Sequence, residues 1–275
     1  MGEPNNLLEV LKHAIIPGGI ILNHLQGRIE NVPKESDLPD SKTDATSTAH
    51  TIADDLVQEV VLEVLHSYMP HLRINAEEST PRTKIFRGEP ENLCFHLDPL
   101  DGTYSYTQGR KDHAIGAAFS RNREFIASAI YFPAVDRVYL SKRGAGVKVE
   151  TSTGEILAFQ RKVEPDAFYS QKRTEKYLPI IRELGLAQFD SMGAHHTMVA
   201  VAEGRVSVLM YHLASPHDFG IPQVIVEEAG GVCTDLNGEA VEYSDDFARV
   251  PWFFAFSHPR IKDEFFRLLG SMSIQ

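Results

Sequence analysis

The sequence predicts a mixed α/β protein of the α+β type, with antiparallel strands in its first half and alternating helices and strands in its second. Apolar residues recur every three or four positions from Ile52 to Val64, which is typical of an amphipathic helix. Two strand-like runs at 114–120 and 125–132 flank a short polar turn and so predict an antiparallel hairpin. Beyond residue 147, helical and strand-like patterns alternate.

The N-terminal elements can be assigned from their turn and cap residues. Residues 5–26 have a helical pattern that Pro17-Gly18-Gly19 is expected to interrupt, and the polar, turn-rich stretch 31–48 is expected to form a loop. Thr51 is placed as the N-cap of the next helix, which should end near Pro70.

The remaining elements follow from the same patterns. The run 71–74 and the alternating run 93–98 are expected to be strands, and the hairpin sheet is expected to continue through 138–140. After residue 147 the predicted elements are a helix at 173–184, strands at 187–192 and 205–211, a helix near 216–230, strands at 232–235 and 252–256, and a final helix at 258–270.

A chain of 275 residues is long for one simple core, so we expect one large two-lobed unit. The change of pattern places a soft boundary near 145–165. We therefore expect an N-terminal α+β lobe at 1–150 and a C-terminal α/β lobe at 151–275.

Composition and charge exclude several classes of function. The net charge of −11 is the wrong sign for a protein that binds a nucleic-acid polymer through its phosphates. No run of about 18 apolar residues is present, so no membrane partner is expected. Cys94 and Cys233 lie far apart in apolar runs and are interpreted as buried free thiols, which indicates a reducing, cytoplasmic location.

The segment Asp98-Pro99-Leu100-Asp101-Gly102-Thr103 carries the strongest chemical signal. Pro99 fixes the backbone, so the two aspartate side chains and the Leu100 carbonyl can point at one position. Gly102 permits close approach to a ligand, and Thr103 adds a hydroxyl and an N–H at the start of a turn or helix. The segment indicates a metal ion beside a phosphate group, although Asp-Pro and Asp-Gly also occur in ordinary turns.

Three further acidic segments are candidates for the same site. Glu77 and Glu78 follow the predicted strand at 71–74, where adjacent glutamates are often only solvated. Asp218 lies in the first turn of a helix that Ser215 can cap, a position where an acid often only compensates the helix dipole. Asp54 lies in the first turn of the helix that follows Thr51, where a capping role is equally open.

In their order along the chain, these four segments resemble the inositol monophosphatase superfamily of metal-dependent phosphatases, over roughly residues 40–235. The run LDPLDGT matches the family signature of a hydrophobic residue followed by Asp-Pro-(Ile or Leu)-Asp-Gly-(Thr or Ser). The acidic pair at 77 and 78, and His-Asp followed by Glu-Glu-Ala-Gly-Gly at 217–231, support the match.

The resemblance implies a fold, a reaction and a set of roles. The fold is a layered α/β/α/β/α sandwich, frequently a homodimer, and lithium often inhibits the family. The reaction is Mg²⁺-dependent hydrolysis of a small phosphate monoester, with inositol monophosphate as the family default. Asp54 and Thr103 would orient or activate the attacking water, assisted by the metal-bound Glu77. The implied metal ligands are Glu77, Asp98, the Leu100 carbonyl, Asp101 and Asp218, and the phosphate would be gripped by Asp101 and by the amides of Gly102 and Thr103.

The chemistry of the residues agrees with that assignment. All the candidate ligands are hard oxygen donors, which select Mg²⁺ or Mn²⁺ over Zn²⁺. Two or three such ions can position an in-line water and neutralise the charge that develops on the attacking and leaving oxygens.

The sequence departs from inositol monophosphatases on the substrate side. His217 replaces the tryptophan common before the last metal-binding aspartate, and Tyr211 replaces a glutamate that contacts inositol hydroxyls. A tyrosine suits a ring or base better than a polyol. Lys172 or Arg173 could bind a second phosphate, although basic residues at a helix start are often simply exposed. Pro222 removes an N–H within the Asp218 helix, so we expect a local kink there.

These departures leave several substrates open. The alternatives to inositol monophosphate are a 3′,5′-bisphosphate nucleotide, fructose 1,6-bisphosphate and histidinol phosphate. A different class of function is also open: a catalytically silent relative that binds metal and a phosphorylated ligand. Because every ligand position is retained, the sequence favours the enzyme.

Overall fold

The computed structural model is built of helices and strands in the mixed arrangement that the sequence predicts. It describes residues 6–32, 49–86, 88, 93–162, 166–170, 174–191 and 193–271. The helices are α1 (Leu7–Leu25), α2 (Ile52–Tyr68), α3 (Thr103–Thr107), α4 (Leu178–Glu183), α5 (Ala194–Ala202), α6 (Ile221–Glu228) and α7 (Pro259–Ser271). The strands are β1 (Arg73–Ala76), β2 (Leu93–Asp101), β3 (Ala114–Arg121), β4 (Glu124–Phe132), β5 (Arg137–Lys142), β6 (Val147–Glu150), β7 (Ile156–Leu157), β8 (Ala167–Ser170), β9 (Ala187–Gln188), β10 (Val208–Ala214), β11 (Val232–Thr234) and β12 (Val250–Phe256).

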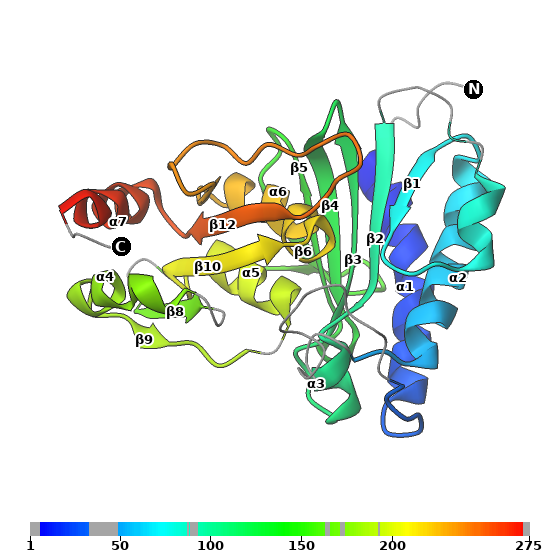
Figure 1. Cartoon of the computed structure of the whole chain (residues 1–275). Coiled ribbons are helices and arrows are strands. Elements are labelled where there is room, and N and C mark those ends of the chain that lie inside the picture. The colour runs from blue at the N-terminus through cyan, green and yellow to red at the C-terminus, as the bar shows by residue number, and fades with distance from the viewer. Residues whose placement is uncertain are drawn as a thin grey trace.

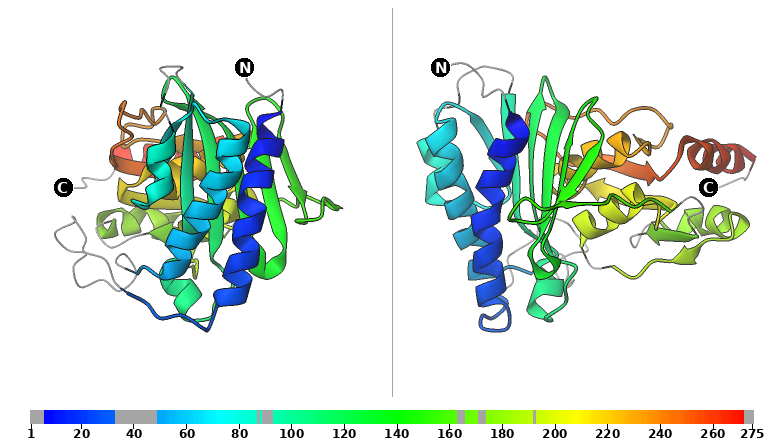
Figure 2. Two further views of the ribbon diagram at one scale, coloured as in Figure 1. Left: turned by 90° about the vertical axis from the view of Figure 1, so that its right-hand side faces the viewer. Right: turned by 180° about the vertical axis from the view of Figure 1, so that it is seen from behind.

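These elements form five layers, so the predicted α/β/α/β/α sandwich is confirmed (Figure 1). The helices α1 and α2 cover one face of a seven-stranded sheet of order β1-β2-β3-β4-β5-β6-β7. The helices α5 and α6 lie between that sheet and a five-stranded sheet of order β11-β12-β10-β8-β9. The helices α4 and α7 lie beyond the second sheet (Figure 2).

Three apolar clusters hold these layers together. One joins α1 and α2 to the first sheet, a second joins both sheets through α5 and α6, and a third joins α4 and α7 to the second sheet. Burial of apolar surface is the main force that stabilises such stacked layers. The first sheet therefore has apolar packing on both faces, which explains why all nine residues of β2 are buried.

The first helix differs from the prediction, because α1 runs through Pro17 without a break. The two glycines serve close packing. A Cβ added at Gly18 would lie 2.8 Å from Val57 of α2, and one added at Gly19 would lie 2.1 Å from the Tyr131 ring of β4. Only glycine allows α1 to approach its neighbours this closely.

The second helix and the hairpin are as predicted. Thr51 caps α2, and its backbone N–H donates to the Asp54 carboxylate in a reciprocal capping box. Strands β3 and β4 pair antiparallel across a turn in which Asn122 and Arg123 have φ angles of 51° and 71°. The loop expected at 31–48 lies almost wholly outside the described residues.

The C-terminal half is less well predicted. The first sheet continues into β6 and β7, where the pattern was expected to change already, and β8 was not expected. The helix predicted at 173–184 is confined to α4 after a short 3₁₀ turn, and the strand predicted at 187–192 ends at Gln188. The helix α5 is missing from the predicted elements. The buried thiols of Cys94 and Cys233 are free, as predicted.

Candidate metal and phosphate site

The C-terminal end of β2, a strand inside the first sheet, carries the two signature aspartates Asp98 and Asp101. In the antiparallel register with β3, Asp98 lies opposite Gly116 and Asp101 opposite Ala114, with a register shift between these two aspartates. The Leu100 N–H donates to Oδ1 of Asp98 over 3.1 Å, which fixes that carboxylate within its own turn. Both aspartates are buried, with 1% and 4% of their surface exposed.

The start of α5 holds the second aspartate. The N–H groups of Ala194 and His195 donate to the two oxygens of the Asp101 carboxylate over 2.8 and 3.0 Å. The N-terminal N–H groups of a helix lack partners within the helix, so a carboxylate is a favourable acceptor there. A Cβ at Gly193 would lie 2.7 Å from Oδ2 of Asp101 and 2.5 Å from the Asp112 carbonyl, so this close contact requires glycine.

Four predicted ligand carboxylates converge at this point. The pKa of Asp98 is raised well above its ordinary value, first by burial and then by the negative charges of Glu77, Asp101 and Asp218. Burial, followed by the charge of Asp218, likewise raises the pKa of Asp101, against the lowering effect of the two α5 N–H groups. Mutual repulsion of this kind marks a site that requires a cation for its charged form.

Glu77 reaches the cluster from the exit of β1. Its backbone N–H donates to the Leu97 carbonyl over 3.0 Å, which continues the parallel pairing of β1 with β2, and its side chain is exposed. The next residue, Glu78, is held by Gln58 of α2, whose side chain bonds both the N–H and the carbonyl of Glu78. The acidic pair is therefore anchored from two elements.

Asp218 reaches the cluster from a wide turn that opens the α6 helix. Ser215 caps this turn, as predicted, and residues Pro216–Gly220 have π-helical geometry. Pro222 stands in the first turn of α6 and has no N–H, so it cannot make the bond that a regular α-helix would form from this position to the Asp218 carbonyl. The expected irregularity at Pro222 is thus a widened helical turn that precedes it. His217, in the same turn, bonds the Asn75 carbonyl of β1 over 3.1 Å through Nε2.

The predicted contact between Asp54 and Thr103 is present. The Thr103 hydroxyl lies 3.0 Å from Oδ1 of Asp54 and 2.9 Å from the Leu100 carbonyl. A hydroxyl has one hydrogen, so it donates to one of these acceptors at a time or is shared between them. Asp54 is buried, and desolvation raises its pKa to about 6.

His195 also belongs to this site, although it is absent from the predicted set. Its ring is fully buried, with Nε2 2.9 Å from the His217 carbonyl and 3.8 Å from Oδ2 of Asp98. Burial lowers its pKa to about 4, so the ring is neutral near pH 7 and Nε2–H donates to the carbonyl. A Cβ at Gly116 would lie 2.1 Å from this ring. In the sequence, His195 and His196 stand close to Gly193, but no local pattern places either ring beside Asp98.

The residues predicted to bind the substrate lie in different parts of the structure. Gly102 has φ 75° and ends β2 just before α3, so the glycine is required by its backbone conformation. Tyr211 on β10 is half-buried, and its ring centroid lies 4.3 Å from that of Phe219. Lys172 and Arg173 lie outside the described residues.

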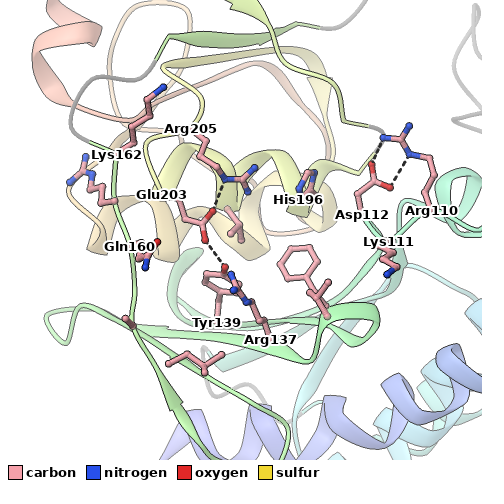
Figure 3. A pocket seen from close by; sticks show the side chains of 16 residues that line it. Arg110, Lys111, Asp112, Arg137, Tyr139, Gln160, Lys162, His196, Glu203 and Arg205 are labelled. Carbon is pink, nitrogen blue, oxygen red and sulfur yellow. Dashed lines mark hydrogen bonds and ion pairs between the residues drawn. The ribbon is translucent and has the colours of Figure 1, made fainter.

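A cationic hollow of about 1130 Å³ lies apart from these carboxylates, and none of the predicted site residues lines it (Figure 3). Much of its positive charge is already paired. Arg110 contacts Asp112 over 2.9 Å, and Arg205 contacts Glu203 over 2.7 Å. Arg161 donates to the backbone carbonyls of Ala229 and Ser257. The hollow therefore differs in charge and chemistry from the carboxylate site.

The donor set fits Mg²⁺. Glu77, Asp98, Asp101 and Asp218 supply carboxylate oxygens and Leu100 a carbonyl oxygen, which are the ligands that hard divalent cations prefer. His195 Nε2, 3.8 Å from Oδ2 of Asp98, is used on the His217 carbonyl instead.

Comparison with known proteins places this fold among the phosphatases. The chain is 26% identical over 272 residues to a fructose-1,6-bisphosphatase/inositol-1-monophosphatase of Thermotoga maritima, covering 93% of this chain and 92% of the relative. The crystal structure of the suppressor protein suhB from Bartonella henselae matches with a TM-score of 0.75 at 21% identity, covering 96% and 98% of the two chains. A structure described as an IMPase/NADP phosphatase complexed with Mg²⁺ and phosphate matches with a TM-score of 0.69 at 18% identity, covering 93% and 91%.

The family model described as the inositol monophosphatase family matches residues 6–254. The chain therefore belongs to the inositol monophosphatase family and is a phosphatase. Within the described part of the chain, no helix combines the length and apolar content needed to cross a membrane.

Proposed function

We propose that the carboxylate cluster hydrolyses a small phosphate monoester with Mg²⁺ as the cofactor. The observation that carries this proposal is the convergence of Glu77, Asp98, Asp101 and Asp218 beside the hydrogen-bonded pair of Asp54 and Thr103. Four carboxylates that repel one another are a poor structural device, but they suit a site that collects divalent cations.

Each ligand has an assigned role in the proposal. Glu77 and Asp98 would hold the ion that activates the attacking water, and Asp101 and Asp218 would hold the ion that stabilises the leaving group. The Leu100 carbonyl is the fifth ligand, and the full set accommodates two or three Mg²⁺ ions, with Mn²⁺ as a substitute. When bound, the ions neutralise charge on the phosphoryl oxygens and acidify the attacking water.

Thr103 and Asp54 orient the attacking water. When the Thr103 hydroxyl donates to Asp54, its lone pairs accept a hydrogen bond from the water. The water oxygen attacks phosphorus as the bond to the ester oxygen breaks, and a water proton passes through Thr103 towards Asp54. The ester oxygen leaves with the bonding electron pair and takes up a proton from solvent to give the alcohol. A base with a pKa of about 6 is well matched to this transfer near neutral pH.

The substrate-binding groups are Asp101, the amides of Gly102 and Thr103, and Tyr211. The amides meet the phosphate at the start of α3, and Tyr211 meets the remainder of the molecule with an aromatic face and one hydroxyl. Inositol monophosphate is the default substrate of the proposal. The alternatives are a 3′,5′-bisphosphate nucleotide, fructose 1,6-bisphosphate and histidinol phosphate, and Lys172 or Arg173 would contact the second phosphate of a bisphosphate.

The test is a phosphate-release assay on these four substrates, each with millimolar Mg²⁺ and with excess chelator. The expected result is turnover of at least one monoester that Mg²⁺ supports and chelation abolishes. Tyr211→Glu and Tyr211→Phe test whether the Tyr211 ring contacts the substrate. If Tyr211 contacts the ring of the substrate, Tyr211→Glu shifts the order of kcat/KM among the four compounds, whereas Tyr211→Phe retains it.

The catalytically silent alternative makes a different prediction. A metal and phospholigand binder would take up Mg²⁺ and bind the phosphorylated compounds without releasing phosphate. Calorimetry on the same panel therefore separates the two functions, because heats of binding without turnover would contradict the enzymatic proposal.

We also propose a homodimer in the cytoplasm, with the N-terminal lobe (1–150) supplying most ligands and the C-terminal lobe (151–275) supplying Asp218. The buried free thiols support a reducing location. Equilibrium sedimentation tests the dimer, which is expected at micromolar concentration.

A further inference from the structure

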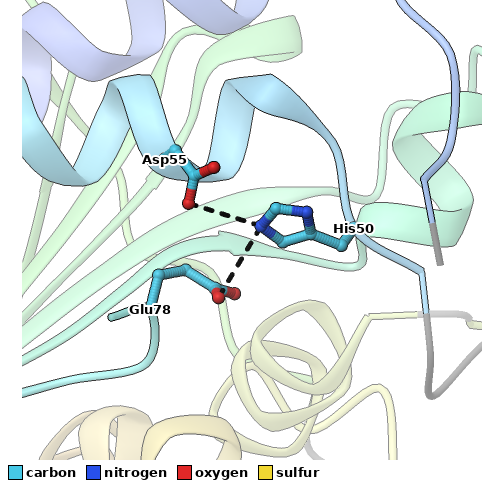
Figure 4. Close-up of side chains that lie close together, drawn as sticks. All are labelled: His50, Asp55 and Glu78. Atoms are coloured by element: carbon cyan, nitrogen blue, oxygen red, sulfur yellow. Dashed lines mark ion pairs between the residues drawn. The ribbon is translucent and has the colours of Figure 1, made fainter. Parts of the chain in front are cut away.

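A second group of potential ligands lies beside the carboxylate site and differs from it in chemistry. His50, Asp55 and Glu78 direct one ligand atom each towards a common point, with these atoms within 4.8 Å of one another. They come from three segments: the chain before α2, the first turn of α2 and the exit of β1 (Figure 4).

The backbone around each of the three side chains is held in place. The His50 N–H donates to the Asn31 side chain over 3.0 Å, and its carbonyl accepts from Val32 over 2.7 Å. Glu78 is fixed at both backbone groups by the buried Gln58. Asp55 is fixed by the first turn of α2. The group is therefore assembled by the fold.

Both contacts of His50 are ion-pair distances longer than a direct hydrogen bond, and the shorter one matches the spacing of two ligands on one metal ion. Nε2 of His50 lies 3.4 Å from Oδ1 of Asp55 and 3.7 Å from Oε2 of Glu78. A charged N–H···O bond spans about 2.7–2.9 Å. Two ligands of a tetrahedral zinc ion, each bonded at about 2.0–2.1 Å, lie about 3.3–3.4 Å apart.

We propose that His50, Asp55 and Glu78 bind a Zn²⁺-class ion at a site separate from the Mg²⁺ cluster. One imidazole and two carboxylates form a donor set that favours zinc over magnesium, because nitrogen ligands suit the softer ion. The site is open to solvent, since the side chains of His50 and Asp55 are 18% and 47% exposed, while that of Glu78 is 9% exposed.

Occupancy of this site would act on the neighbouring one. Asp55 follows Asp54 in the chain, and Glu78 follows Glu77. One ion bonded to Asp55 and Glu78 joins the start of α2 to the exit of β1, the two segments that carry Asp54 and Glu77. Zinc should therefore raise the melting temperature of protein already saturated with Mg²⁺.

The experiment titrates Mg²⁺-saturated protein with Zn²⁺ by calorimetry and with Co²⁺ by visible absorption, where tetrahedral Co²⁺ gives intense bands. The variants are His50→Ala and Asp55→Asn, with His71→Ala as the control because His71 is exposed and outside the group. Asp98→Asn is included to disable the Mg²⁺ cluster. Circular dichroism confirms that each variant is folded.

The expected result is one Zn²⁺ per chain in the wild type, His71→Ala and Asp98→Asn, with affinity at least about tenfold weaker in His50→Ala and Asp55→Asn. If His50→Ala does not fold, Asp55→Asn alone tests the Zn²⁺ site, because the substitution is conservative and the position is exposed. Equal Zn²⁺ affinity in all variants, Zn²⁺ uptake that excess Mg²⁺ or Asp98→Asn eliminates, or octahedral Co²⁺ spectra would overturn the proposal.

Discussion

The Thr103 hydroxyl lies 3.0 Å from Oδ1 of Asp54, although the two residues are 49 positions apart in sequence. The other oxygen of the same carboxylate, Oδ2, accepts from both the N–H and the hydroxyl of Thr51 over 2.8 Å. Asp54 therefore has two separate tasks, one at each oxygen: it caps α2 through Oδ2 and positions Thr103 through Oδ1.

The first prediction concerns the water-orienting pair. Thr103→Val and Asp54→Asn should each lower kcat and kcat/KM together by about 10²–10⁴-fold, because they remove an interaction made chiefly in the transition state. The double variant should lose little more than either single variant, since the two residues act as one unit. Turnover and Mg²⁺ affinity are measured side by side. Near-additive losses, or turnover recovered at high Mg²⁺, would contradict this role.

The control for that prediction is Thr51→Val, which removes the hydroxyl at the Oδ2 side of Asp54 and leaves Thr103 unchanged. Loss of an N-cap side chain costs about 1 kcal/mol of stability. Thr51→Val should therefore lower the melting temperature while turnover stays within a few-fold of the wild type.

Residues of the candidate site that lie close together in the sequence could be predicted, whereas contacts between residues far apart in the sequence could not. The LDPLDGT run places Asp98, Asp101 and Thr103 within six residues, so one turn positions them and the sequence reveals them. The cap at Thr51 and the helical period after it likewise located Asp54. The bonds from Ala194 and His195 to Asp101 join residues more than 90 positions apart, and no local pattern announces them.

The second prediction is that Asp98→Asn stabilises the metal-free protein. The amide oxygen can still accept the Leu100 N–H, while the buried negative charge beside Glu77, Asp101 and Asp218 is removed. In excess chelator the variant should melt several degrees above the wild type, and its gain in melting temperature on adding Mg²⁺ should be smaller. Asp263→Asn, at an exposed position on α7, should change the free energy of unfolding by less than about 0.5 kcal/mol. Equal melting temperatures for Asp98→Asn and the wild type in chelator would count against a strained cluster.

The third prediction concerns pH in the metal-free protein. Burial raises the pKa of Asp54 from its ordinary 3.8 to about 6, so the native state binds more protons than the unfolded state between these values. The stability that protonated Asp54 contributes is thus fully present below pH 4 and is lost as the pH rises to 6. One pKa unit corresponds to about 1.4 kcal/mol, so Asp54 alone should lower the free energy of unfolding by a few kcal/mol over this pH range. The raised pKa values of Asp98 and Asp101 act in the same direction.

Saturating Mg²⁺ should remove this loss, because bound cations favour the ionised carboxylates and bind only the native state. Urea unfolding at pH 4, 5, 6 and 7, with Mg²⁺ and with chelator, gives the comparison. Stability that rises with pH in chelator, or melting curves that Mg²⁺ leaves unchanged, would refute the assignment.

The fourth prediction concerns the contact between α5 and the Asp101 carboxylate. Gly193→Ala places a methyl group 2.5 Å from the Asp112 carbonyl and 2.7 Å from Asp101, so α5 must move away from the site. We expect at least a tenfold loss of turnover together with a lower melting temperature. Gly270→Ala in α7 is the matched control. Its methyl group has no neighbour within 4 Å, so it should leave turnover unchanged and gain up to about 1 kcal/mol of helix stability. Wild-type behaviour of Gly193→Ala would show that α5 does not fix Asp101.

In the fold, too, elements set by neighbouring residues were predicted, whereas elements set by tertiary packing were not. The hairpin of β3 and β4 and the cap of α2 are set by neighbouring residues and were predicted. The break expected at Pro17 does not occur, because packing of Gly18 and Gly19 against α2 and β4 sustains α1. The short strands β6 to β8 carry two to four residues each, too few for a periodic signal, and they exist only because neighbouring strands pair with them.

The most direct test of the carboxylate site measures phosphate release by the wild type and Asp98→Asn at equal concentrations of folded protein. Each is assayed with millimolar Mg²⁺ and with excess chelator. Turnover is expected only in the wild type with Mg²⁺, and none above background in the other three samples. Turnover by Asp98→Asn comparable to that of the wild type, or by the wild type in chelator, would contradict the claim that this cluster is the metal-dependent catalytic site.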